Sequence, residues 1–100
     1  MFIAMNRFKI KLGCEQTFVD IWKGRDTFLD TAPGFKRFHL LRGETHDDYT
    51  EFASHSTWES RNAFEAWTKS EAFRKAHANA GTHREIYLGP PQLDLYEGAL

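Results

Sequence analysis

A histidine in the second half of the chain has the surroundings expected of a residue that binds a flat ligand. His77 lies four residues after Phe73, so both side chains fall on one stripe of a predicted helix that Gly81 can end. The neighbouring small residues, which leave the imidazole open to a broad partner, are Ala76, Ala78 and Ala80. A neutral imidazole here could bind a metal ion, although the same pattern also fits an ordinary core or surface histidine.

An aromatic pair lies upstream of this histidine. Ser60 is a favourable N-cap residue for a helix, and Phe64 and Trp67 fall three residues apart on one face of that helix. In one unbroken helix, the side chains of Trp67 and His77 would point more than about 60° apart around the helix axis. The helix is therefore predicted to break at residues 68–70, where a serine can cap a second helix.

An asparagine interrupts the apolar face of the first predicted strand. Residues 2–12 alternate with a period of two. The more apolar face of this strand carries Phe2, Ala4, Asn6, Phe8 and Ile10. Burying the Asn6 amide without partners would cost about 1 to 3 kcal/mol. Asn6 must therefore bond to backbone, to water or to a ligand, and a neighbouring loop could serve as well as a ligand.

An arginine lies on or beside the apolar stripe of the first predicted helix. That helix is predicted over residues 15–31, and its stripe consists of Phe18, Ile21, Trp22, Arg25, Phe28 and Leu29. Arg25 could be a surface residue whose stem packs on apolar neighbours. It could equally be the counter-charge for an acidic group of a ligand.

The remaining histidines and the single cysteine show no spacing typical of catalysis. His39 and His55 lie within predicted strands, and His46 and His83 lie in predicted loops. None of the four has a metal-ligand spacing or a nucleophile with an acid in register. Cys14 is the only cysteine, so an intrachain disulfide and a thiolate metal cluster are both excluded. A chain of this kind suits a reducing cytoplasm.

The elements that must position these residues follow the order βαββαβ. The other strands are predicted over residues 35–42, 49–58 and 92–97, with a polar hairpin loop at 43–48. This order is typical of an α+β, ferredoxin-like fold, in which two helical segments cover one face of a four-stranded antiparallel sheet. The other face keeps exposed apolar residues, and a homodimer formed through that face would cover them.

The composition excludes several classes of protein. One hundred residues with 41% hydrophobic residues fit a single domain spanning residues 1–100. The net charge of -1 argues against a nucleic-acid-binding protein, and no apolar segment approaches the ~20 residues of a membrane span or resembles an export signal. Nine Phe, three Trp and three Tyr predict either a self-associating surface or an aromatic-lined cavity.

One long motif resembles a known family. The sequence from Trp58 to His77 reads W-E-S-x-x-A-F-x-x-W-x-x-S-x-x-F-x-x-x-H, and it follows A-P-G-F at Ala32–Phe35. Together with Asn6 in the first strand, this pattern resembles the antibiotic-biosynthesis-monooxygenase superfamily, and within it the IsdG-type heme-degrading monooxygenases. The first half of the motif is shared widely in the superfamily and indicates the fold, whereas the combination of Asn, Trp and His is more selective.

The resemblance implies a role for each candidate residue. His77 would be the proximal axial ligand of the heme iron, and Asn6 would lie on the distal side and bond to iron-bound oxygen. Trp67 would press on the macrocycle and help it to depart from planarity. Phe64 and Phe73 would line the pocket between the sheet and the helices.

The resemblance also implies the partners of the reaction. The active form would be a homodimer whose two sheets make an αβ-barrel. Heme would be both substrate and cofactor, and O2 and an external electron donor would be consumed as the ring opens to a bilin-type product and iron is released. The heme propionates would face solvent or cations, for which Arg25 and Arg74 are candidates that match no motif position.

Two other functions fit the same sequence. The first is a cofactor-independent oxygenase of this superfamily that acts on a polycyclic phenol or quinone, where His77 or Asn6 would handle a substrate proton or oxygen. The second is a dimer without enzymatic activity, which either carries heme or has no ligand. The co-occurrence of Asn6, Trp67 and His77 favours heme degradation over both.

Overall fold

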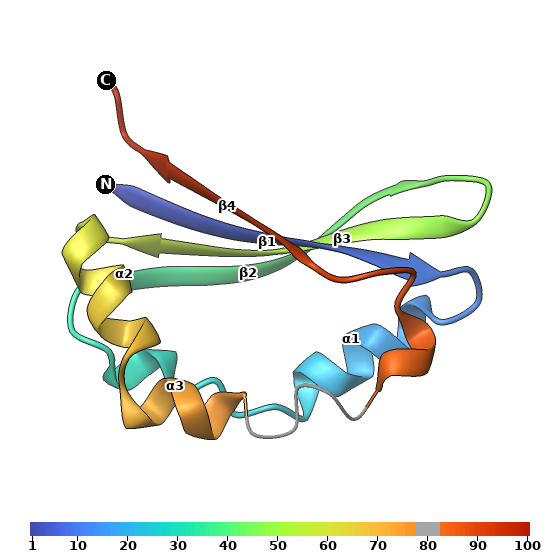
Figure 1. Ribbon diagram of the computed structural model, residues 1–100, viewed down its shortest axis with the longest axis horizontal. Helices are drawn as coiled ribbons and strands as arrows, with labels where there is room; N and C mark the ends of the chain where they lie inside the picture. Colours follow the sequence, from blue (N-terminus) through green and yellow to red (C-terminus); the bar gives the residue numbers. More distant parts are fainter. Residues whose placement is uncertain (78–82) are drawn as a thin grey trace.

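The computed structural model describes residues 1–77 and 83–100, which form a sheet with helices on one face (Figure 1). The strands are β1 (Phe2–Lys11), β2 (Phe35–Thr45), β3 (Tyr49–Trp58) and β4 (Gln92–Glu97). They form one antiparallel sheet of four strands in the order β2-β3-β1-β4. The helices are α1 (Glu15–Lys23), α2 (Arg61–Thr68) and α3 (Glu71–Ala76), with short 3-10 turns η1 (Leu29–Thr31) and η2 (Arg84–Ile86). The α+β, ferredoxin-like fold predicted from the sequence is confirmed, and the sheet is open.

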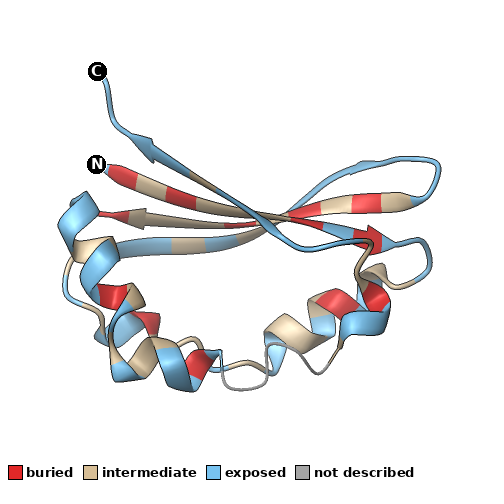
Figure 2. Cartoon of the chain, in the orientation of Figure 1, coloured by how far each residue is buried: buried red, intermediate tan, exposed pale blue. Residues whose placement is uncertain are grey.

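The period of two along β1 decides which residues lie beneath the helices. β1 is central in the sheet and pairs with β3 on one side and β4 on the other. Phe2, Ala4, Phe8 and Ile10 on its apolar face are all buried, and Figure 2 shows buried positions alternating with less buried ones along the strand. Burying one such large side chain is worth about 1.5 to 3 kcal/mol, which fixes this face toward the helices.

The core consists of two clusters at opposite ends of the sheet. The cluster beneath α2 and α3 contains Phe2, Leu29, Trp58, Trp67 and Ala76, whereas the cluster beneath α1 contains Phe8, Ile10, Phe18, Phe52 and Ile86. Asn6 occupies the position on β1 between Ala4 and Phe8, where neither cluster fills the face. The middle of the covered face is thus left for a cavity.

The break between α2 and α3 is confirmed. The Ser60 hydroxyl accepts a hydrogen bond from the Ala63 N–H at 3.1 Å, and the Ser70 hydroxyl accepts one from the Phe73 N–H at 3.1 Å. Ser70 also donates to the Trp67 carbonyl at 2.7 Å, which holds the end of α2 against the start of α3. α3 ends at Ala76, so His77 is the C-cap residue rather than part of the helix.

The A-P-G-F turn packs tightly against α2. Gly34 has a φ of +84°, and a Cβ atom built there would lie 2.6 Å from the Cβ of Ala63. The Gly34 carbonyl accepts a hydrogen bond from the Glu59 N–H at 2.7 Å. Only glycine fits this close approach, which is the physical reason for that part of the motif.

Two boundaries differ from the sequence prediction. α1 ends at Lys23 instead of continuing to Thr31, because Gly24 caps it and the Asp26 carboxylate accepts the Phe28 N–H at 3.0 Å. β2 continues to Thr45, beyond the predicted end at residue 42, because the Thr45 and Thr50 hydroxyls pair at 3.0 Å across the hairpin. The predicted helix end at Gly81, and the alanines at 78 and 80, lie outside the described residues. None of the described helices is long and apolar enough to cross a membrane, since the longest has nine residues.

Candidate functional site

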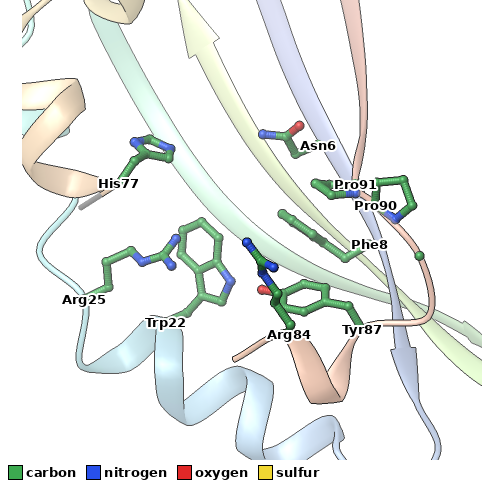
Figure 3. Close-up of a pocket in the computed structure, with 10 residues that line it drawn as sticks. Asn6, Phe8, Trp22, Arg25, His77, Arg84, Tyr87, Pro90 and Pro91 are labelled. Carbon is green, nitrogen blue, oxygen red and sulfur yellow. The ribbon is translucent and has the colours of Figure 1, made fainter. Parts of the chain in front are cut away.

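A cavity with two adjoining parts lies between the sheet and the helices, and Figure 3 shows the residues that line the larger part. The parts have volumes of about 470 and about 280 Å³. Both are lined by Asn6, Trp22, Arg25 and His77, which come from β1, α1, the segment after α1 and the end of α3. A cavity of this size between packed elements is typical of a site for a small organic ligand.

The imidazole of His77 is oriented by its own helix. His77 is exposed, and its ring stacks on Phe73 with 4.1 Å between centroids and 29° between planes. The Nδ1 atom lies 2.8 Å from the Phe73 carbonyl oxygen. Because a carbonyl can only accept, Nδ1 must carry the hydrogen, so in the neutral form of the imidazole the lone pair is on Nε2. A hydrogen bond from the other ring nitrogen to a carbonyl commonly orients a metal-binding histidine in this way.

The amide of Asn6 reaches the cavity from the centre of the sheet. Asn6 pairs with Ser54 on β3 and with Leu93 on β4, and both of these residues also line the smaller part of the cavity. Within residues 1–77 and 83–100, no hydrogen bond satisfies the Asn6 carboxamide. In Figure 3, Asn6 and His77 approach the same hollow from opposite sides. The structure thus brings these two predicted residues together.

Trp67 is both a core residue and a wall of the smaller part of the cavity. Only 7% of its surface is exposed, and its ring lies 6.1 Å from Trp58 and 5.7 Å from Phe73 between centroids. Phe64 and Phe73 line the same part. All three aromatic residues predicted for the pocket therefore lie on it.

Arg25 lines both parts of the cavity, although it lies beyond the end of α1. Its guanidinium carbon lies 4.5 Å from the centroid of the Trp22 ring, which is a cation–π contact. Arg74, the other arginine proposed for the propionates, lies on the exposed side of α3 and does not line either part.

Among the cavity residues that sequence reasoning missed, three carry donor groups, namely Trp22, Arg84 and Tyr87. Trp22 was expected only as part of the apolar stripe of α1, and the segment holding Arg84 and Tyr87 gave weak signals of structure. Burial raises the pKa of the Tyr87 hydroxyl above its usual range, although the positive charge of Arg25 acts in the opposite direction. Tyr87 is therefore protonated at neutral pH.

The lining of the cavity is electrostatically one-sided. Arg25 and Arg84 contribute two guanidinium groups, whereas no Asp or Glu among the described residues lines either part. The whole chain carries 14 acidic residues against 13 basic ones, so this lining does not reflect its average charge. The arrangement favours a ligand that carries negative charge.

The other four histidines lie away from this cavity. His39 and His55 face each other across β2 and β3 with 6.5 Å between ring centroids, on the sheet face opposite the helices. His46 stacks on Tyr49 at 4.6 Å. His83 precedes η2. Among the residues that the structure describes, no three His, Cys, Asp or Glu side chains gather as they would around a metal ion.

The sequence of residues 1–79 matches the profile of the antibiotic biosynthesis monooxygenase family. The chain belongs to this family. The resemblance drawn from the W-E-S-x-x-A-F motif is thereby confirmed, and the family is one of monooxygenases.

Similar proteins show which activities occur on this antibiotic biosynthesis monooxygenase fold. A heme-degrading monooxygenase from Bacillus thuringiensis (strain Al Hakam) is 32% identical over 81 residues, which are 81% of this chain and 75% of that protein. The heme-degrader MhuD from Mycobacterium tuberculosis, solved with two hemes in its active site, is 25% identical with a TM-score of 0.74 over 100% of this chain and 97% of MhuD. SnoaB, a cofactor-independent oxygenase from Streptomyces nogalater, is 21% identical with a TM-score of 0.70 over 99% of this chain and 93% of SnoaB. The likeness to SnoaB is one of fold alone.

Proposed function

We propose that this chain is a heme-degrading monooxygenase. It binds heme as its substrate and, with O2 and an external electron donor, opens the porphyrin ring, releasing iron and a bilin-type product. The observation that carries the proposal is that His77 and Asn6, far apart in the sequence, line one cavity from opposite sides. The heme-degrading relatives from Bacillus thuringiensis and Mycobacterium tuberculosis support it.

The cavity residues fit a heme. His77 would hold the heme iron through Nε2, because its Nδ1–H is held by the Phe73 carbonyl at 2.8 Å. Trp67 and Phe73 offer apolar surface to the ring, which binds a macrocycle without many hydrogen bonds. Arg25 is the counter-charge for a propionate.

Heme, when bound, supplies the iron at which dioxygen is activated. With heme in the cavity, the Asn6 carboxamide NH2 would be the donor available to hydrogen-bond and orient oxygen there. Trp67 would pack against the ring from the wall of the smaller part of the cavity, so it would help to set how the ring is oriented relative to Asn6. The aromatic walls exclude water from this region.

The active form in this proposal is a homodimer. Figure 1 shows all helices on one face of the sheet, and the opposite face carries Ile3, Met5, Leu41 and Tyr96. Leu41 and Tyr96 are 42% and 54% exposed in the single chain. A second copy of the chain covers these side chains, and a reductase or small reductant supplies the electrons.

Addition of hemin to the purified protein tests the proposal. A sharp Soret band should appear, and it should decay to a bilin-type absorption when a reductant is added in air. A band that persists under these conditions contradicts degradation and indicates a heme carrier. Folded protein that gives no band contradicts heme binding, and the cofactor-independent oxygenase on a polycyclic phenol or quinone then becomes the better candidate, as the fold of SnoaB permits.

A further inference from the structure

The indole N–H of Trp22 is a buried hydrogen-bond donor without an acceptor. Its Nε1 atom is inaccessible to solvent, and within the described residues no group accepts its hydrogen. An unsatisfied buried donor of this kind costs about 1 to 3 kcal/mol. Buried indole N–H groups usually find a partner, so this one needs a specific explanation.

Two side chains pack against the indole. It stacks with Phe38, with 5.5 Å between centroids and 26° between planes. The guanidinium carbon of Arg25 lies 4.5 Å from the ring centroid. Because these contacts fix the plane of the ring, the N–H has little freedom to turn toward another acceptor.

The N–H edge of Trp22 is turned toward Arg84, which lines the larger part of the cavity together with Tyr87 (Figure 3). Because the Nε1 atom is closed to solvent, a ligand group reaches it only when a neighbouring side chain moves aside. An indole and a guanidinium are donors only, so they cannot satisfy each other. No carboxylate among the described residues lines this part. The missing group is an acceptor, and beside a guanidinium an anionic acceptor is the most favourable.

We propose that the Trp22 N–H and the Arg84 guanidinium together bind a carboxylate of the ligand, at the end of the cavity that Tyr87 closes. The inference rests on the proposed function and deepens it, because it assigns one heme propionate to this end. The planar ligand is then fixed at two points, the carboxylate at Trp22 and the axial nitrogen of His77. Trp22 acts as a positioning residue, which sets the rotation of the ring in the cavity.

Trp22→Phe tests this proposal because it removes the N–H and keeps an aromatic ring. We expect Trp22→Phe to weaken hemin binding by roughly 10- to 100-fold, the usual effect of losing a hydrogen bond to a charged group. Binding of hemin dimethyl ester, which lacks the carboxylates, should be the same in the wild type and in Trp22→Phe. The thermal midpoint should not fall, because the variant removes an unsatisfied donor.

Two further variants separate recognition of the carboxylate from a change of shape. Arg84→Gln should lose hemin selectively as well, and the double variant should lose less than the product of the two single losses, since both groups bind one carboxylate. Trp67→Phe is the matched control, because it changes another tryptophan of the cavity wall and should weaken hemin and its dimethyl ester equally.

The outcomes distinguish this inference from the proposed function. Equal loss of hemin and ester in Trp22→Phe, or no loss of either, overturns the carboxylate site even if the wild type degrades heme. A selective loss for hemin, repeated with iron-free protoporphyrin IX, supports the carboxylate site even if no degradation occurs. A folded wild type that binds neither porphyrin overturns both.

Discussion

Replacing Asn6 with alanine separates a role in chemistry from a role in folding. The amide lies on the apolar face of β1 and forms no hydrogen bond within the described residues. We expect Asn6→Ala to slow degradation of bound hemin by about 100- to 1,000-fold, the effect of removing one donor that stabilises developing charge. That change corresponds to about 2.7 to 4 kcal/mol in the activation barrier.

The same substitution should leave folding and binding nearly unchanged. An amide with no protein partner contributes little to stability, so the free energy of unfolding should change by less than about 1 kcal/mol. For a domain of this size, that is less than about 4 to 8 °C in the thermal midpoint. The dissociation constant of hemin should stay within about threefold, because the apolar walls and His77 provide the binding.

Single-turnover decay of the Soret band with reductant in air is the assay, alongside a thermal melt and a hemin titration. Ser54→Ala is the matched control, because Ser54 pairs with Asn6 across β1 and β3 and is 8% exposed beside the same cavity. It should retain turnover within about threefold. Unchanged turnover in Asn6→Ala, or a loss of stability of several kcal/mol, would refute the catalytic role and make Asn6 a structural amide.

Four other substitutions test the site, the core, a contact between α1 and β3, and the assembly. His77→Ala should abolish the ligated heme spectrum without lowering the thermal midpoint, and added imidazole should restore the spectrum. If the variant already shows the wild-type spectrum without imidazole, ligation by His77 is contradicted. Phe18→Ala should lower the free energy of unfolding, measured in urea, by about 3 to 5 kcal/mol, because the Phe18 ring is fully buried with its centroid 4.9 Å from that of Phe52. A loss below about 1 kcal/mol would be inconsistent with this packing. The buried Thr50 hydroxyl donates a hydrogen bond of 2.8 Å to the Glu15 carboxylate, which holds the pKa of that carboxyl below its ordinary value of 4.5. The stabilising effect of this hydrogen bond is therefore present above about pH 4.5 and is lost as the pH falls through the lowered pKa. Glu15→Gln should flatten that part of a stability curve measured against pH, and an unchanged curve would argue against the contact. Tyr96→Lys should shift the sedimentation coefficient toward that of a monomer, whereas a wild type that sediments as a monomer would contradict the dimer.

The boundaries of several elements follow from local chemistry and were predictable. The alternation along β1, the serine caps at Ser60 and Ser70, and the break between α2 and α3 all depend on residues within a few positions of one another. The end of α1 was nevertheless predicted wrongly. Its termination depends on an Asp26 side chain folding back to the Phe28 N–H, and a stripe of apolar residues does not reveal that competition.

The sequence by itself singled out Asn6, Trp67 and His77 for the proposed heme site, because their combination is the selective part of the family resemblance. Only the tertiary structure decided that Trp22 and Arg84 share the cavity, since the helix pattern predicts core for Trp22 and the segment before Arg84 has no periodicity. The physical reason is that periodicity reports which side of an element is buried. How the chain packs decides which distant element a buried face contacts, and whether a donor on that face finds an acceptor there.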